Sequence, residues 1–227
     1  MKSDAGPHTP QAGFTIIELM IALAAAGIVV AASLVAMTRI HDDAGLSTAY
    51  WQCESRLQMA LDDVSTYLLE TRPSLVSFYT YNRDGRQHTA ISFPTARDRD
   101  GNFVLRDENG AVAAVPHWQG IVVYAYADGF VRRYIDYSER SYSSPVSITN
   151  ITSTQIILND GTRFNLDGTP RNSNQRVMTV LDHARRFVAE NTTPIHLIME
   201  AEIVLTRPPQ QTYVITLDTG ILARNNN

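Results

Sequence analysis

The sequence predicts an α+β protein, in which a long N-terminal α-helix packs on an antiparallel β-sheet domain. Three observations support this prediction. Residues 14–38 form an apolar run with one ionisable side chain, residues 39–72 carry apolar side chains at helical spacing, and residues 73–227 hold short β-type runs separated by turn sequences. The first two segments would form one continuous helix, and the third would form the sheet.

The run GFTIIELMIALAAAGIVVAASLVAMT covers residues 13–38 and has the length of a membrane span. The uncharged stretch from Leu19 to Thr38, at about 1.5 Å of rise per residue, reaches roughly 30 Å, the hydrocarbon thickness of a bilayer. Glu18 is the one ionisable residue between Phe14 and Thr38. A carboxylate entering the membrane costs at least about 2.5–3.5 kcal/mol on insertion scales, so a sequence that keeps one has a use for it. Gly27 and many alanines leave shallow surfaces that let helices approach closely.

The segment from residue 39 to residue 72 is amphipathic. Its apolar stripe comprises Leu46, Tyr50, Cys53, Leu57, Ala60, Leu61, Val64 and Leu68. Pro73 predicts that the helix ends near Thr71 or Arg72, because the residue before a proline avoids the α region. A parallel coiled coil over residues 40–70 is the alternative, although clear e/g charge pairing is missing.

The remaining residues, about 155 of them, suffice for one core. Hairpins are expected where turn residues separate β-type runs, as Ala127-Asp128-Gly129 and Asn159-Asp160-Gly161 do. Residues 176–190 are ambiguous between a short helix and a strand-loop-strand. The expected strands are Leu75–Tyr81, Thr89–Phe93, Ile121–Tyr126, Phe130–Tyr137, Gln155–Leu158, Thr162–Leu166, Ile195–Thr206 and Thr212–Leu222.

Composition limits the function classes. The formal net charge is −4, and no basic stripe with interleaved aromatic residues occurs, so nucleic-acid binding is not expected. Cys53 is the single cysteine, which excludes an intrachain disulfide. Its expected role is packing within the helical stripe, and an intersubunit disulfide is the alternative.

Motifs for catalysis or cofactor binding do not stand out. The histidines are scattered, and a nucleophile elbow, a phosphate-binding glycine loop and a dinucleotide fingerprint are missing from the sequence. We therefore expect neither an enzyme nor a cofactor. Asp98, Asp100 and Asn102, with Gly101 between them, are a weak calcium candidate, and a solvated turn is the preferred interpretation.

The pattern Gly13-Phe14-Thr15 with Glu18, followed by the apolar run, resembles the N-terminus of type IV prepilins and type II secretion pseudopilins. The resemblance covers about 25 residues. It implies that residues 1–13 are a leader peptide, that prepilin peptidase cleaves between Gly13 and Phe14, and that Phe14 is then N-methylated. Glu18 would become the fifth residue of the mature chain and, in a filament, would pair with the terminal amine of another subunit.

The same resemblance implies a structural role in a type IV pilus or pseudopilus. Residues 14–38 would span the bacterial inner membrane with the N-terminus in the cytoplasm, and the chain would then be drawn into a periplasmic or extracellular filament. Its partners would be other pilins and minor pilins, prepilin peptidase, the inner-membrane assembly platform and, before assembly, membrane lipid.

A finer resemblance points to J-type pseudopilins and the related W-type minor pilins, which are subunits of a priming or tip complex. It rests on Trp118-Gln119-Gly120 before the hairpin, on residues 180–187 and on Ala223-Arg224-Asn225. Two alternatives remain: a tip adhesin or DNA-uptake subunit that binds through the loops of residues 80–117, and a membrane-anchored enzyme that only resembles a prepilin.

Overall fold

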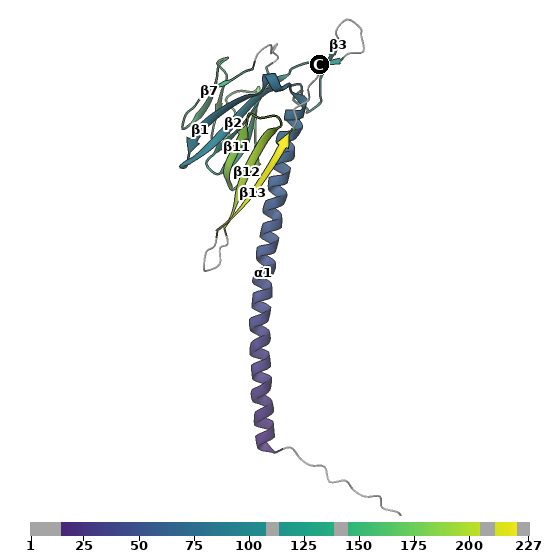
Figure 1. Cartoon of the computed structure of the whole chain (residues 1–227), viewed down its shortest axis with the longest axis vertical. Helices are drawn as coiled ribbons and strands as arrows, with labels where there is room; N and C mark the ends of the chain where they lie inside the picture. Colours follow the sequence, from purple (N-terminus) through teal and green to yellow (C-terminus); the bar gives the residue numbers. More distant parts are fainter. Residues whose placement is uncertain (1–14, 108–113, 139–144, 205–211, 222–227) are drawn as a thin grey trace, which may run out of the picture. The chain divides into compact units, whose positions relative to one another are not determined.

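The structure is a computed structural model that describes residues 15–107, 114–138, 145–204 and 212–221. It contains one α-helix, α1 (Ile16–Glu70), a short 3₁₀ helix (Pro73–Leu75) and a set of antiparallel β-strands (Figure 1). The chain divides into two compact units after Thr48, and each is described separately below. The expected α+β class, a long helix packed against antiparallel sheets, is confirmed.

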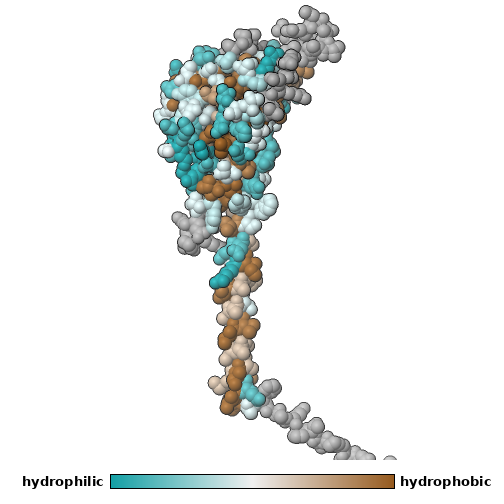
Figure 2. Space-filling view, viewed as in Figure 1, coloured by the Kyte–Doolittle hydropathy of each residue, from teal (hydrophilic) through white to brown (hydrophobic). Residues whose placement is uncertain are grey.

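The first unit contains the membrane-length half of α1. Its side chains from Ile16 to Ile40 are exposed, including every large apolar one, and Figure 2 shows apolar surface over much of this segment. Within the described residues, α1 is the one helix long and apolar enough to cross a membrane. Helical structure continues through Gly27 and Gly45. The helix ends at Glu70, just before the position that Pro73 predicts.

The second unit contains the other half of α1 and all the strands (Figure 1). A five-stranded sheet has the order β1-β2-β5-β6-β10, and smaller sheets are formed by β11-β12-β13, β7-β8-β9 and β3-β4. The strands are β1 (Ser77–Arg83), β2 (Arg86–Thr95), β3 (Leu105–Asp107), β4 (Ala114–Pro116), β5 (Gly120–Ala127), β6 (Phe130–Asp136), β7 (Ile148–Ile151), β8 (Gln155–Leu158), β9 (Arg163–Asn165), β10 (Gln175–Leu181), β11 (Ala184–Glu190), β12 (Ile195–Val204) and β13 (Thr212–Ile221).

The five-stranded sheet has apolar clusters on both of its faces. On one face, Leu57, Val64 and Leu68 of α1 pack with residues of β2, β5 and β6 and with the β11-β12-β13 sheet. On the other face, the sheet packs against β7, β8 and β9, with Phe164 fully buried. Every residue of β5 is therefore buried, which explains why GIVVYAYA lacks the polar alternation of a strand with one solvated face.

The single antiparallel sheet expected from the sequence is thus divided into several sheets stacked in layers. Residues 176–190, which the sequence left ambiguous, form two strands, β10 and β11, joined through His183 with a φ of 51°. The physical reason for the layering is burial: the apolar residues of the two outer sheets need a surface to cover, and β5 supplies apolar side chains on both faces.

The amphipathic stripe is buried along only part of its length. Leu57, Ala60, Leu61, Val64 and Leu68 are buried, as predicted, but Tyr50 is 45% exposed. The helical spacing places Tyr50 on the same face of the helix as the buried residues, but the packed sheets leave it accessible. The coiled-coil alternative is not needed to explain the stripe, because its buried part packs on the β-strands.

Gly120 shows a requirement of the fold that the sequence alone does not reveal. A Cβ at this position would lie 2.3 Å from the backbone oxygen of Asp136, where β5 and β6 approach each other. Real Cβ atoms do not approach a backbone atom so closely, so only glycine fits here.

Candidate functional site

The N-terminus of α1 is capped by a reciprocal pair of hydrogen bonds between Thr15 and Glu18. The Thr15 backbone N–H donates to Glu18 Oε2 at 2.9 Å, and the Glu18 N–H donates to Thr15 Oγ1 at 3.3 Å. The Thr15 hydroxyl donates to the same carboxylate oxygen at 2.9 Å. This is a capping box, which satisfies two of the amide groups that a helix start leaves without partners.

The capping box gives Glu18 a role within its own chain that differs from the pairing inferred from the sequence. Only Oε2 is engaged, and Oε1 accepts no hydrogen bond from any residue in the described part of the chain. Thr15 belongs to the pattern that carries the resemblance, but its capping role was not predicted, although the spacing T-x-x-E at the start of an apolar run is the signal for that role. Gly13 and Phe14, the expected cleavage residues, lie outside the described residues, as does the segment from Ala223 to Asn225.

The helical surface that follows Glu18 is apolar, and many of its side chains are short. Between Ile28 and Ile40, one shallow depression is lined by Ala31, Ala32, Val35 and Ala36 together with the stem of Arg39. Side chains this short let another helix approach closely, as they do in lipid or in a dry bundle of helices. An apolar exposed surface of this size on a soluble protein marks a membrane or protein contact.

In the second unit, ionic and aromatic contacts join α1 to the sheet. The carboxylate of Asp63 on α1 accepts a hydrogen bond from Tyr124 Oη at 2.6 Å and pairs with the Arg133 guanidinium. The same guanidinium lies over the ring of Tyr67, 4.6 Å from its centroid. Tyr124 is fully buried, and this burial raises the pKa of its hydroxyl well above the ordinary value, so it remains a donor.

A second pair lies about two turns further along α1, seven residues after Asp63. Glu70 accepts hydrogen bonds from Arg97 Nε at 2.9 Å and 3.1 Å, one on each oxygen, and Arg97 NH1 donates to the backbone oxygen of Gly101 at 2.8 Å. Charge-assisted bonds of this forked kind fix geometry as well as adding energy. Together with the Asp63 contacts, they hold the last turns of the helix in one orientation on the sheet.

The weak calcium candidate is a turn stabilised by its own amides. Asp98 Oδ1 accepts the backbone N–H groups of Asp100 and Asn102, both at 2.9 Å, and Oδ2 accepts the Asn102 side chain at 3.3 Å. These bonds, that from Asn102 first, lower the pKa of the Asp98 carboxyl. Within the described ranges, no group of three or more His, Cys, Asp or Glu side chains is arranged to hold a metal ion. The solvated turn remains the preferred interpretation.

Cys53 is half-buried and packs against the cluster beneath α1. Burial raises the pKa of its thiol, with a smaller opposing effect from Arg56. A raised pKa keeps the group in the unreactive thiol form. The packing role expected from the helical stripe fits this position, and the disulfide alternative stays untested.

The fold and the helix N-terminus together define a class: a pilin-like protein with an exposed apolar helix and a β-rich domain packed on the end of that helix. A family model for the prokaryotic N-terminal methylation motif matches residues 9–34. This is the motif of the type IV pilin and pseudopilin superfamily, whose members are structural subunits and not enzymes. The chain is therefore a type IV pilin-like protein that carries the motif for prepilin processing, and its subtype is not resolved by the match.

Two broader comparisons add nothing to this assignment, since no curated protein and no solved structure matches the chain.

Proposed function

We propose that this protein is a minor pilin or pseudopilin, cleaved by prepilin peptidase between Gly13 and Phe14 and assembled into a type IV pilus or pseudopilus. The observation that carries the proposal is the exposed apolar helix from Ile16 to Ile40, most of which lies within the methylation-motif match of residues 9–34. Before assembly this helix would lie in the inner membrane, with the leader in the cytoplasm and the β-domain outside. In the filament it would exchange lipid for the helices of other subunits.

Glu18 would guide the position of each subunit in the filament. Cleavage creates an amine on Phe14, and the Oε1 atom that the capping box leaves open is available to the amine of a neighbouring subunit. In a water-poor core, an ion pair offsets the loss of hydration only where the geometry is good, and an unpaired carboxylate is costly. A misplaced subunit would therefore be disfavoured, and the pair would select the correct stagger.

We further propose a place in a priming or tip complex with other minor subunits. Its support is the resemblance of residues 118–134 and 180–187 to J-type pseudopilins and W-type minor pilins. These residues form the β5–β6 hairpin and the β10–β11 junction.

Substitutions at Glu18 test the proposed assembly role. Glu18→Ala removes both the charge and the helix cap, whereas Glu18→Gln keeps an acceptor for the cap and removes only the charge. We expect prepilin peptidase to cleave both variants, and we expect both to be depleted from sheared filaments at least severalfold relative to wild type. Asp43→Asn, an exposed change on the same helix, is the matched control and should be incorporated normally. Normal incorporation of Glu18→Gln would contradict the proposal that Glu18 forms an ion pair with a neighbouring subunit.

A further inference from the structure

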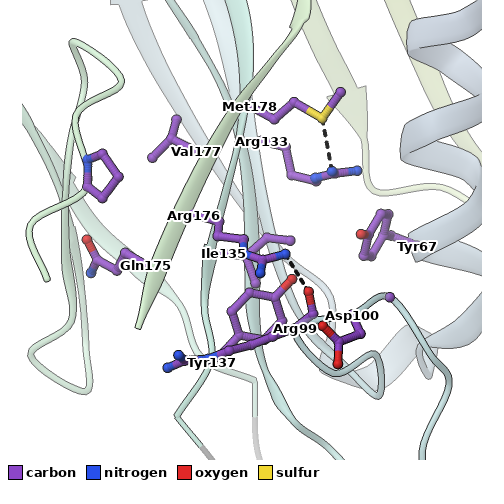
Figure 3. Close-up of a pocket in the computed structure, with 12 residues that line it drawn as sticks. Tyr67, Arg99, Asp100, Arg133, Ile135, Tyr137, Gln175, Arg176, Val177 and Met178 are labelled. Atoms are coloured by element: carbon purple, nitrogen blue, oxygen red, sulfur yellow. Dashed lines mark hydrogen bonds between the residues drawn. The ribbon is translucent and has the colours of Figure 1, made fainter. Parts of the chain in front are cut away.

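A pocket of about 520 Å³ lies beside the joint between α1 and the sheet (Figure 3). Tyr67 of α1 and the turn that follows β2 line one side, and the last residues of β6 and the first residues of β10 line the other. Three arginines line this pocket, Arg99, Arg133 and Arg176, against one carboxylate, Asp100. A pocket of this volume has the size of a small-molecule or side-chain binding site.

The three guanidinium groups are held by neighbours that leave donor groups unused. Arg176 donates to the backbone oxygen of Arg99 and lies 5.7 Å from the centroid of the Tyr137 ring, and Arg99 donates to the side-chain oxygen of Asn174. Neither Arg99 nor Arg176 has a carboxylate within salt-bridge distance in the described residues. Among the residues that the structure describes, both are therefore cations without an anionic partner.

Arg133 lies deeper, with 13% of its side chain exposed. Asp63 neutralises it, and its NH2 group approaches the sulfur of Met178 at 3.2 Å. Its Nε atom is buried and has no acceptor among the residues that the structure describes. A buried donor without an acceptor is costly, so an oxygen atom from outside this chain would fit here.

Among the described residues that line the pocket or pair with its lining, counting Asp63 and Asp100 against the three arginines leaves a surplus of one positive charge. This surplus stands out in a chain whose formal net charge is −4. Guanidinium groups resting on tyrosine rings have already lost part of their freedom, so less is lost when they bind a carboxylate. Ile135 and Val177 add apolar surface to the lining. The chemistry thus favours a carboxylate on an apolar stem.

We propose that this pocket receives the carboxylate side chain of an acidic residue from a neighbouring filament subunit, an inference that rests on the proposed function. Such a side chain would approach along β10, which is an edge strand of the five-stranded sheet and pairs only with β6 among the described strands. An extended segment could lie beside that edge and place an acidic side chain in the pocket. Nucleic acid is disfavoured, because one surplus charge does not make a track of phosphate contacts.

Peptide binding tests the chemistry of the pocket directly. The full-length protein in detergent micelles is titrated into fluorescein-labelled Val-Glu-Val-Glu-Val-amide and into the counterpart with Gln in place of Glu, and anisotropy is measured. We expect the acidic peptide to bind at least tenfold more tightly than the Gln peptide. Combined Arg99→Gln and Arg176→Gln substitutions should weaken binding at least tenfold. Arg171→Gln, an exposed arginine outside the pocket lining, should leave it within twofold.

Three results of this titration would overturn the proposal. They are equal binding of the two peptides, binding that the Arg99 and Arg176 substitutions leave unchanged, and displacement of the acidic peptide by oligodeoxythymidine at equal concentration. The last result would assign the pocket to nucleic acid instead.

Filament incorporation tests the identity of the partner. Arg176→Glu should lower the amount of protein in sheared filaments at least threefold, whereas Arg171→Glu should not. Normal incorporation of Arg176→Glu would overturn the docking role even if the peptide binds. Absence of the wild-type protein from filaments would instead overturn the proposed function and, with it, a filament subunit as the occupant, while the peptide result would still report on carboxylate binding. The two failures are therefore distinguishable.

Discussion

At the scale of single residues, the structure assigns physical roles to side chains that carry no recognisable motif. His88 is an example: it is fully buried, and its ring stacks on Tyr126 with centroids 3.9 Å apart. One ring nitrogen lies 3.2 Å from the backbone oxygen of Arg83, and the other accepts the Phe187 N–H at 3.4 Å. The ring therefore bridges β2 and β11 as a neutral imidazole, with Nε2 protonated.

We predict that His88 makes the stability of the β-domain depend on pH. Burial lowers its pKa below the ordinary value of 6.5. The unfolded chain therefore binds a proton at a higher pH than the folded chain does, so stability is complete above about pH 6.5 and falls as the pH is lowered from there. Thermal unfolding of the full-length protein followed by circular dichroism at pH 5 to 8 measures this. The slope should be smaller in His88→Gln, and an unchanged slope would show that other groups cause it.

Gly120 gives a second prediction at this scale. Gly120→Ala forces a methyl group against the backbone oxygen of Asp136, so we expect a loss of roughly 1–3 kcal/mol or more in the free energy of unfolding. Gly45→Ala is the matched control, because a Cβ there meets open space within a helix and should be neutral or stabilising by up to about 1 kcal/mol. Denaturant unfolding compares the two variants, and equal stabilities would contradict the close approach of β5 and β6.

At the scale of elements, the joint between α1 and the sheet fixes the orientation of the helix end on the strands. In the proposed filament this subunit would be held by its helix and would display its β-domain, so the two must not shift against each other. Burial of Leu57, Val64 and Leu68 supplies attraction without direction, whereas the Asp63–Arg133 and Glu70–Arg97 pairs set the orientation.

Asp63→Asn tests the joint. The change leaves the guanidinium of Arg133 without its carboxylate in a largely buried position, which should cost about 3 kcal/mol of stability. Asp62→Asn removes a neighbouring carboxylate that is exposed and accepts only a bond from Gln58 in the described residues, so it should change stability by less than about 0.5 kcal/mol. Denaturant unfolding of both variants gives the comparison, and similar losses for the two would argue against a specific role for Asp63.

The elements that the sequence predicts well are those with local signals. The apolar run, the end of the helix near Pro73 and the β5–β6 hairpin around Asp128 and Gly129 follow from composition, proline geometry and turn residues. The joint was not predictable in this way, because Asp63 and Arg133 are 70 residues apart in the sequence and only the packed sheet brings them together. The capping box could have been predicted from the sequence, because Thr15 and Glu18 are separated by one helical turn.

At the scale of the whole molecule, the two units have opposite surface properties. The helix before Thr48 has exposed apolar side chains. The β-domain, in contrast, buries most of its apolar residues in two clusters. The layered burial of β5 could not be read from its sequence, because an apolar run of this length fits several kinds of buried strand. The exposed apolar side chains of the first unit suit the proposed move from a membrane into a bundle of like helices.

The most direct test of this account is the mass of the protein recovered from sheared surface filaments or, for a pseudopilus, from the assembled fibre fraction. The account predicts a chain that begins at Phe14, carries a methyl group on its terminal amine and is found with other pilin-like subunits. Recovery of the protein only from the membrane fraction, with Met1 to Gly13 still attached, would contradict it.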